Sequence, residues 1–257
     1  MCSWSSCLCL KADAVADNTD INDLIAENSK DTTHFIASPE TIEQMIKAGL
    51  KLDEQKLMTE DEYIEQLFAS RQDAAKKLIK QLPAPPQLAL PPLTSLYAEI
   101  RECILFGLNG AAITLSAILV EFAIKHAIVD RTKGVEVYDK QEWDRIEGRE
   151  LGKVIDEAAK LKMFDDDEIK RLKTFKDKVR NPYLHYNIKK ITTGAVMPEV
   201  SAYSTKTGKI EKQYNLKAED NPFLWQLAKK HIDEQMVLDY FNFVDSIVKR
   251  LFGVGSQ

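Results

Sequence analysis

Cysteine is scarce in this chain of 257 residues, which has only four. Three of them stand at positions 2, 7 and 9, and the fourth, Cys103, falls within a helical pattern. This spacing is neither a disulfide framework nor the paired C-x-x-C sets that hold zinc. The sequence therefore predicts an intracellular, cytoplasmic protein, and we expect no metal site and no cofactor.

Strong charge of either sign and long apolar runs are also missing. The formal net charge is -5 and the sequence pI is about 5.5. This balance disfavours nucleic-acid binding over a broad basic surface but leaves room for a local basic cleft. The longest apolar stretch, residues 111–129, is interrupted by Glu121, Lys125 and His126, so we expect no membrane span. The first residues lack the basic region of a secretory signal peptide.

Prolines cluster in one segment of the chain. Five prolines between residues 83 and 92 predict a stiff linker over 83–93. Before it, residues 1–37 are polar and weakly patterned, and we expect them to be flexible. Residues 38–82 predict a helical extension of two helices, which begin at Ser38 and Thr59.

Residues 94–252 form the predicted main domain, which we expect to be all-α. Apolar residues recur at helical spacing in several segments. These segments are 94–107, 111–130, 149–163, 165–190 and 223–252. The second of them is apolar almost all round, so it should lie buried at the centre of an up-and-down bundle of four to five helices.

Two parts of this domain depart from the helical pattern. Residues 135–148 predict an irregular connection. After residue 190 the chain is rich in Thr, Val, Ile and Tyr, and a Lys-Thr-Gly-Lys turn divides it. This composition predicts a β-hairpin at about 190–216, with strands at 195–203 and 209–216, inserted before the last helix.

The hexapeptide RNPYLH, Arg180 to His185, lies near the end of the fourth helical segment. Proline inside a helix costs roughly 3 kcal/mol, so either the helix ends here or a bend is used. Arginine offers phosphate a planar fork of donors, and histidine transfers protons near neutral pH. Both groups suit the cleavage of RNA without a metal, because the 2′-hydroxyl of RNA can attack the adjacent phosphorus.

Three segments together resemble the HEPN domain family (higher eukaryote and prokaryote nucleotide-binding). They are the central helix with its lone carboxylate (LVEFAIKHAI), the next helix (LGKVIDEAAKL) and LKTFKDKVRNPYLH. The motif of that family is Arg, often followed by Asn, Asp or His, and then His after four to six residues. Arg180, Asn181 and His185 match it, and the resemblance covers roughly residues 94–252. Some HEPN toxins add a tyrosine two residues after the histidine, where this chain has Asn187.

The resemblance implies roles for four residues. Arg180 would orient and stabilise the phosphate, and His185 would act as general acid or base. Asn181 would position RNA or His185. Glu121 would hold Arg180 or His185 in place, since a lone carboxylate on so apolar a helix needs a partner.

Each candidate also has a structural interpretation. Arg180 could simply pair with an acid of a neighbouring helix, and His185 could be a hydrogen-bonded residue at a helix end. Tyr183 and Tyr186 either contact RNA by stacking on its bases or pack against the protein. His126 is expected to be an ordinary surface or edge residue.

A single straight helix cannot point Arg180 and His185 at the same phosphate, because residues five apart on it point about 140° from each other. Pro182 could correct the angle between Arg180 and His185 by kinking the helix. Alternatively, two chains could pair about a twofold axis so that both motifs line one cleft. The resemblance to HEPN ribonucleases implies the second arrangement, a composite site in a homodimer.

Two classes of function follow. The first is a dimeric, metal-independent endoribonuclease acting on RNA in a toxin–antitoxin or antiviral defence system, where HEPN domains commonly occur. Its N-terminal helices would dock a regulatory partner protein. The second is a HEPN-like binding or scaffold module without catalysis, which docks a partner protein or a nucleotide. An electropositive groove around Arg180 and His185 at a symmetric interface would favour the first class, and burial of both with local partners would favour the second.

Overall fold

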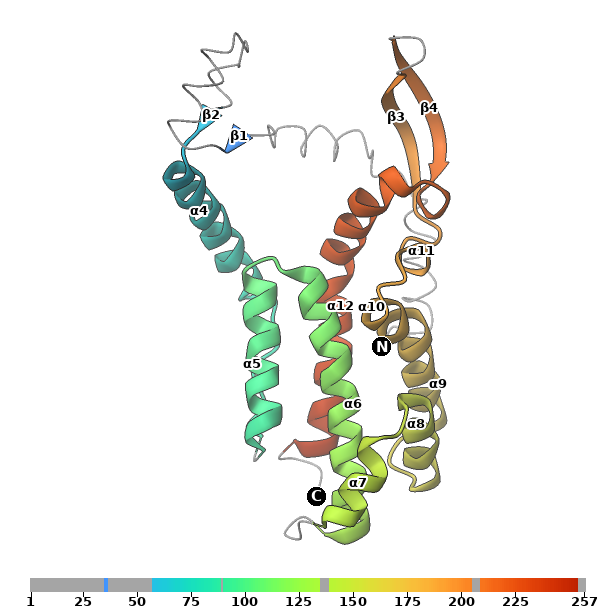
Figure 1. Ribbon diagram of the computed structural model, residues 1–257. Helices are drawn as coiled ribbons and strands as arrows, with labels where there is room; N and C mark the ends of the chain where they lie inside the picture. The colour runs from blue at the N-terminus through green and yellow to red at the C-terminus, as the bar shows by residue number, and fades with distance from the viewer. Residues whose placement is uncertain (1–34, 37–56, 89, 135–138, 205–208, 254–257) are drawn as a thin grey trace. The chain divides into compact units, whose positions relative to one another are not determined.

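The computed structural model describes residues 35–36, 57–88, 90–134, 139–204 and 209–253 (Figure 1). Of the expected flexible segment, residues 1–37, only Phe35 and Ile36 lie within these residues. The expected helix that begins at Ser38 lies outside them entirely.

The chain divides into two compact units. One comprises residues 1–74 and 194–221, and the other comprises residues 75–193 and 222–257. The division falls before the proline-rich stretch in which the sequence predicts a linker. It also groups the hairpin with the N-terminal unit rather than with the predicted main domain.

The described part of the second unit is mostly helical, as expected. Its elements are α5 (Pro91–Leu105), α6 (Asn109–Lys133), α7 (Lys140–Glu147), α8 (Leu151–Lys160), α9 (Asp166–Phe175), η2 (Lys176–Arg180), α10 (Asn181–Leu184), α11 (Ile188–Ile191), η4 (Pro222–Leu224) and α12 (Trp225–Phe252). Helix α5 begins inside the expected linker, because Pro91 occupies the first helical position, where its missing N–H costs nothing.

Helix α6 forms the centre of this unit, as the sequence predicts. It packs against α5 and α12, which run beside it (Figure 1). Residues from all sides of α6 are buried, among them Ile113, Leu119 and Ile124. The Tyr97 hydroxyl of α5 donates to Asp245 Oδ1 of α12 at 2.6 Å, and the Tyr97 ring lies 5.1 Å from that of Phe241. A polar contact and an aromatic contact therefore join the two outer helices.

Contrary to the sequence expectation, α6 is long and apolar enough to cross a membrane by length and composition alone. However, 67% of its most apolar window is buried inside the protein. The core helix of a bundle passes the same test, and the burial identifies α6 as such a helix.

The connection that we expected to be irregular contains a helix, α7. Asp139 caps it by accepting a hydrogen bond from the Glu142 N–H at 3.0 Å. Only Ile146 of its residues is buried, so the segment shows almost no apolar periodicity. The cap was the available signal, and the prediction of an irregular segment was wrong.

In the first unit, β3 (Val196–Ser204) and β4 (Lys209–Lys217) pair antiparallel. These bounds agree within one residue with the strands expected from the sequence. The Ala218 N–H donates to the Ala195 carbonyl oxygen and closes the base of the hairpin beside η3 (Ala218–Asp220). A parallel pair of two-residue strands, β1 (Phe35–Ile36) and β2 (Leu57–Met58), also belongs to this unit.

Helix α4 (Glu60–Leu78) begins in the first unit and ends in the second. Thr59 caps it, as expected, through a reciprocal pair of hydrogen bonds with Glu62. None of its residues is buried. Large apolar side chains are exposed along it, namely Tyr63, Ile64, Leu67 and Phe68.

Candidate functional site

A π-helical turn, η2, ends at Arg180, the first residue of the hexapeptide RNPYLH. The Asn181 N–H donates to the carbonyl oxygen of Lys176, five residues back, instead of the usual four. Pro182 follows and has no N–H to donate. The wider turn lets the chain continue helically past the proline, and π-turns of this kind often mark functional sites.

The helix ends at Leu184, so the expected continuous helix over 165–190 is wrong. Tyr186 adopts a positive φ of 45°. Its N–H donates to the Tyr183 carbonyl oxygen at 3.2 Å, and the Asn187 N–H donates to the Pro182 carbonyl oxygen at 2.7 Å. This pair of bonds is a Schellman motif, which ends a helix and usually places glycine at the positive-φ position. This chain has tyrosine at that position, so the sequence contains no glycine signal for the end of the helix.

Arg180 binds Glu121 across 59 positions of sequence. Arg180 Nη2 and Nε donate to Glu121 Oε2 at 2.9 and 3.2 Å, and Nη1 donates to Asn181 Oδ1 at 3.0 Å. The side chains of Arg180 and Glu121 are 19% and 16% exposed. The structure thus brings together three of the predicted site residues, and Glu121 holds Arg180 as its place on α6 suggested.

Glu121 has a second cationic partner. Lys125, one turn further along α6, donates from Nζ to Glu121 Oε1 at 2.8 Å and to the Glu147 carbonyl oxygen at 2.8 Å. Lys125 is buried, so this network satisfies a charge that would otherwise be costly. A single carboxylate therefore stands between two cations and joins α6 to the motif.

His185 occupies the position that caps the end of α10, and it is exposed. Its imidazole makes no hydrogen bond or ion pair with the other residues that the structure describes. His185 is thus free of the Arg180–Glu121 network, although only four residues separate it from Arg180.

Tyr183 lies in the core, which leaves no ring face for an RNA base. Its hydroxyl donates to Asp233 Oδ1 at 2.5 Å, and only 7% of the residue is exposed. Burial, together with the nearby Asp233 carboxylate, raises the pKa of the phenol far above its usual value. The predicted RNA contact of Tyr183 is wrong, and the packing interpretation is correct.

Tyr186, in contrast, is 57% exposed. Its hydroxyl accepts a hydrogen bond from Gln226 Nε2 at 3.0 Å. The ammonium of Lys229 lies 5.9 Å from the centre of the Tyr186 ring and 5.1 Å from that of Tyr183. Both partners come from the first turns of α12, which the sequence did not suggest as part of a site.

His126 is not the ordinary edge residue that we expected. Its Nδ1 lies 3.0 Å from Asp130 Oδ2. The imidazole packs edge-on against three aromatic rings, those of Phe122, Trp143 and Phe252. Phe122 precedes His126 by one helical turn, which was the signal in the sequence. The ring from α7 and the ring from α12 could not be foreseen.

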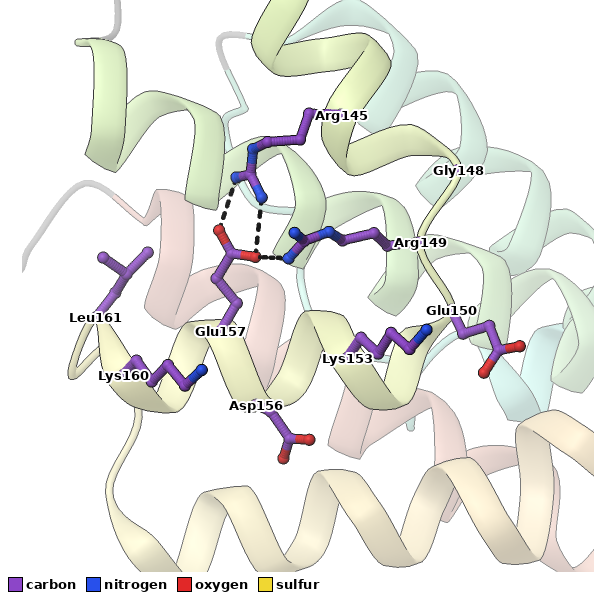
Figure 2. Close-up of a pocket in the computed structure, with 9 residues that line it drawn as sticks. All are labelled: Arg145, Gly148, Arg149, Glu150, Lys153, Asp156, Glu157, Lys160 and Leu161. Carbon is purple, nitrogen blue, oxygen red and sulfur yellow. Dashed lines mark hydrogen bonds and ion pairs between the residues drawn. The ribbon is translucent and has the colours of Figure 1, made fainter.

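A pocket of about 790 Å³ lies on α7, α8 and the turn between them (Figure 2). Arg145 and Arg149 converge on Glu157 at its centre, with Arg145 Nη2 2.6 Å from Glu157 Oε1. The hydrogen bonds from Arg145 hold the pKa of the Glu157 carboxyl below its usual value. Lys153 and Lys160 also line the pocket.

None of the predicted site residues lines this pocket. Its two arginines already have carboxylate partners, since Arg145 also binds Glu142. The network therefore joins α7 to α8. Among the described residues, no group of three or more His, Cys, Asp or Glu could hold a metal ion.

No family model matches the chain, and neither a curated protein nor a solved structure matches it.

Proposed function

We propose that the second unit is a HEPN-like helical domain and that it acts as a metal-independent endoribonuclease. The proposal rests on the contacts and the exposure of the two motif residues, Arg180 and His185. Glu121 and Asn181 fix Arg180, whose side chain is 19% exposed, while His185 is exposed and unbonded among the described residues. A fixed cation and an accessible proton-transfer group in one short segment are what phosphodiester cleavage requires.

The chemistry assigns one task to each residue. The 2′-oxygen of RNA attacks the adjacent phosphorus and loses its proton to a base, and the 5′-oxygen leaves with a proton from an acid. The products are a 2′,3′-cyclic phosphate and a 5′-hydroxyl. His185 can serve as base or acid because imidazole titrates near neutral pH. Arg180 has five N–H groups, of which three donate to Glu121 and Asn181, so two remain for phosphoryl oxygens.

The proposed active form is a homodimer. Residues five apart on a straight helix point about 140° from each other, and two chains paired about a twofold axis would supply both groups to one cleft. The cytoplasmic setting of a toxin–antitoxin or antiviral defence system is part of the same proposal. So is a regulatory partner protein, which would dock on the exposed apolar side chains of α4.

The test is incubation of purified protein with total RNA in EDTA. Arg180→Lys keeps a cation for Glu121 but lacks the planar fork, so it is preferable to alanine. We expect Arg180→Lys and His185→Ala each to slow cleavage by about 100-fold or more. His231→Ala, a change to a half-buried histidine of α12, is the matched control and should cleave like the parent protein.

The second candidate function is a HEPN-like scaffold without catalysis. The observation that favours it is the pairing of Arg180, whose side chain is largely buried against partners of its own chain. His185 does not meet the same condition, because it is exposed. An absence of cleavage, together with RNA or partner binding that is unchanged in His185→Ala, would support the scaffold and exclude the enzyme.

A further inference from the structure

Three helices of the second unit end in the same backbone motif. At each end one residue takes a positive φ, with values of 68° for Gly107, 53° for Lys162 and 45° for Tyr186. At each end the N–H of the positive-φ residue and that of the next residue donate to carbonyl oxygens three and five residues back, respectively. In α5 the bonds run from Gly107 to Ile104 and from Leu108 to Cys103. In α8 they run from Lys162 to Ala159 and from Met163 to Ala158, and in α10 from Tyr186 to Tyr183 and from Asn187 to Pro182. The ends of α5 and α8 can therefore be compared directly with the end of α10 at Tyr186.

Tyrosine is the least suited of the three residues to this position. Glycine adopts a positive φ without steric cost, whereas a residue with a Cβ is disfavoured and a bulky one more so. Burial of the ring does not offset this cost, because 57% of Tyr186 remains exposed. An unfavourable conformation that burial does not explain suggests that the side chain serves contact with a ligand.

The surroundings hold the ring in one place. Gln226 Nε2 donates to the Tyr186 hydroxyl at 3.0 Å, and the Lys229 ammonium lies 5.9 Å from the ring centre. Lys229 is itself held by Asp233, with an Nζ to Oδ2 distance of 2.5 Å. The ring is therefore presented in a fixed position rather than left to rotate in solvent.

We propose that Tyr186, Gln226 and Lys229 form a platform that binds one nucleobase of the RNA. This inference rests on the proposed function. An exposed aromatic ring stacks on any base, and such stacking needs no particular sequence. The carbonyl oxygen of Gln226 is available to accept a hydrogen bond from a base edge, and Lys229, paired with Asp233, supports the Tyr186 ring. Since His185 directly precedes Tyr186, a base on the platform places its ribose near the proton-transfer group.

The experiment measures binding of a fluorescent 2′-O-methyl oligoadenylate by anisotropy. This probe lacks the attacking hydroxyl, so binding is separated from cleavage. We expect Tyr186→Gly to weaken binding on the order of 10-fold, while the thermal midpoint stays unchanged or rises because glycine relieves the backbone strain. Tyr186→Trp keeps a stacking ring and should bind like the parent protein.

Two controls separate the ring from its backbone and from exposed tyrosine in general. Lys162→Gly relieves the same strain at the end of α8 and should leave binding unchanged. Tyr214→Ala removes a tyrosine of matched exposure, 59%, from the hairpin, and it should also leave binding unchanged. Inorganic polyphosphate has no bases, so its own affinity, measured by displacement of the probe, should be the same for Tyr186→Gly and the parent protein.

The outcomes distinguish this inference from the proposed function. Equal binding by Tyr186→Gly and the parent protein, or no binding by the parent protein, overturns the platform. A marked loss of thermal stability in Tyr186→Gly also overturns it, because the ring would then serve packing. Tyr186-dependent binding without any cleavage of ordinary RNA supports the platform and rejects only the endoribonuclease.

Discussion

At the scale of single residues, Glu121 is the carboxylate on which two cations of the bundle depend. It accepts from Arg180 through one oxygen and from buried Lys125 through the other. Taking a carboxylate away from buried cations costs more than losing an exposed ion pair, because the cations stay desolvated without a partner. Glu121 is therefore a structural residue whether or not RNA is the substrate.

We expect Glu121→Gln to lower the free energy of unfolding by about 2 kcal/mol, a value reduced from that of a fully buried pair because the site is partly exposed. Urea denaturation measures this change. Asp156→Asn, which breaks an ion pair with Lys173 whose side chains are 57% and 48% exposed, should change it by less than about 1 kcal/mol. Equal effects of the two variants would contradict this assignment.

The sequence revealed some residue contacts and concealed others. A lone carboxylate on an apolar helix predicts a partner, and Arg180 in the motif was the candidate that the structure confirms as the contact of Glu121. The partner of Tyr183 was not predictable. Asp233 is one of several acids on α12, and only the packing of α10 against that helix selects it.

At the scale of secondary-structure elements, the junction of α7 and α8 depends on protonation. Hydrogen bonds from Arg145 lower the pKa values of Glu142 and Glu157 in the folded state. A carboxyl group whose pKa is lower in the folded state stabilises the fold above its unfolded pKa, about 4.3 for Glu. This stabilisation is lost as the pH falls through the lowered value.

We expect Glu157→Gln to lower the thermal midpoint at pH 7 and to have a smaller effect as the pH falls from about 4.3 toward 3. Thermal melts from pH 3 to 7 measure both curves. Glu150→Gln changes an exposed residue of the same pocket and should follow the parent protein throughout. Parallel curves for Glu157→Gln and the parent protein would show that this carboxylate is not responsible for the acid sensitivity.

Long elements were predictable and short ones were not. Helix α6 is apolar almost all round and α12 has apolar residues at helical spacing, over 25 and 28 residues respectively. Patterns of this length identify a helix despite local exceptions. Helix α7 has eight residues and a single buried one, so its capping aspartate was the only indication. The break at Tyr186 escaped prediction because the position most often taken by glycine holds an aromatic residue.

At the scale of the whole molecule, the helical unit depends on the contact of α5, α6 and α12. Phe241 is completely buried, and its ring packs on that of Tyr97. Periodicity predicted that these three helices would share a core. It could not predict how the chain divides into units, because that division depends on contacts between segments far apart in sequence.

We expect Phe241→Ala to lower the free energy of unfolding by about 3 to 5 kcal/mol, since it removes a fully buried ring and leaves a cavity. Phe106→Ala removes a ring that is 52% exposed at the end of α5, and it should cost less than about 0.5 kcal/mol. Urea midpoints of the two variants provide the comparison. A small effect of Phe241→Ala would mean that the core can collapse around the missing ring.

The π-helical turn at Lys176–Arg180 has a consequence for how this segment can change in evolution. Such a turn holds one residue more than an α-helical path of the same rise. Loss of that extra residue would return the turn to an ordinary α-helix, and the residues after it would keep their direction. Insertion or loss of a residue between Arg180 and Tyr183 would instead rotate one of them by about 100° relative to the other. Arg180 could then no longer meet Glu121 while Tyr183 met Asp233. The π-helical turn is therefore the place where this segment can change its length, whereas the stretch between the two contacts cannot.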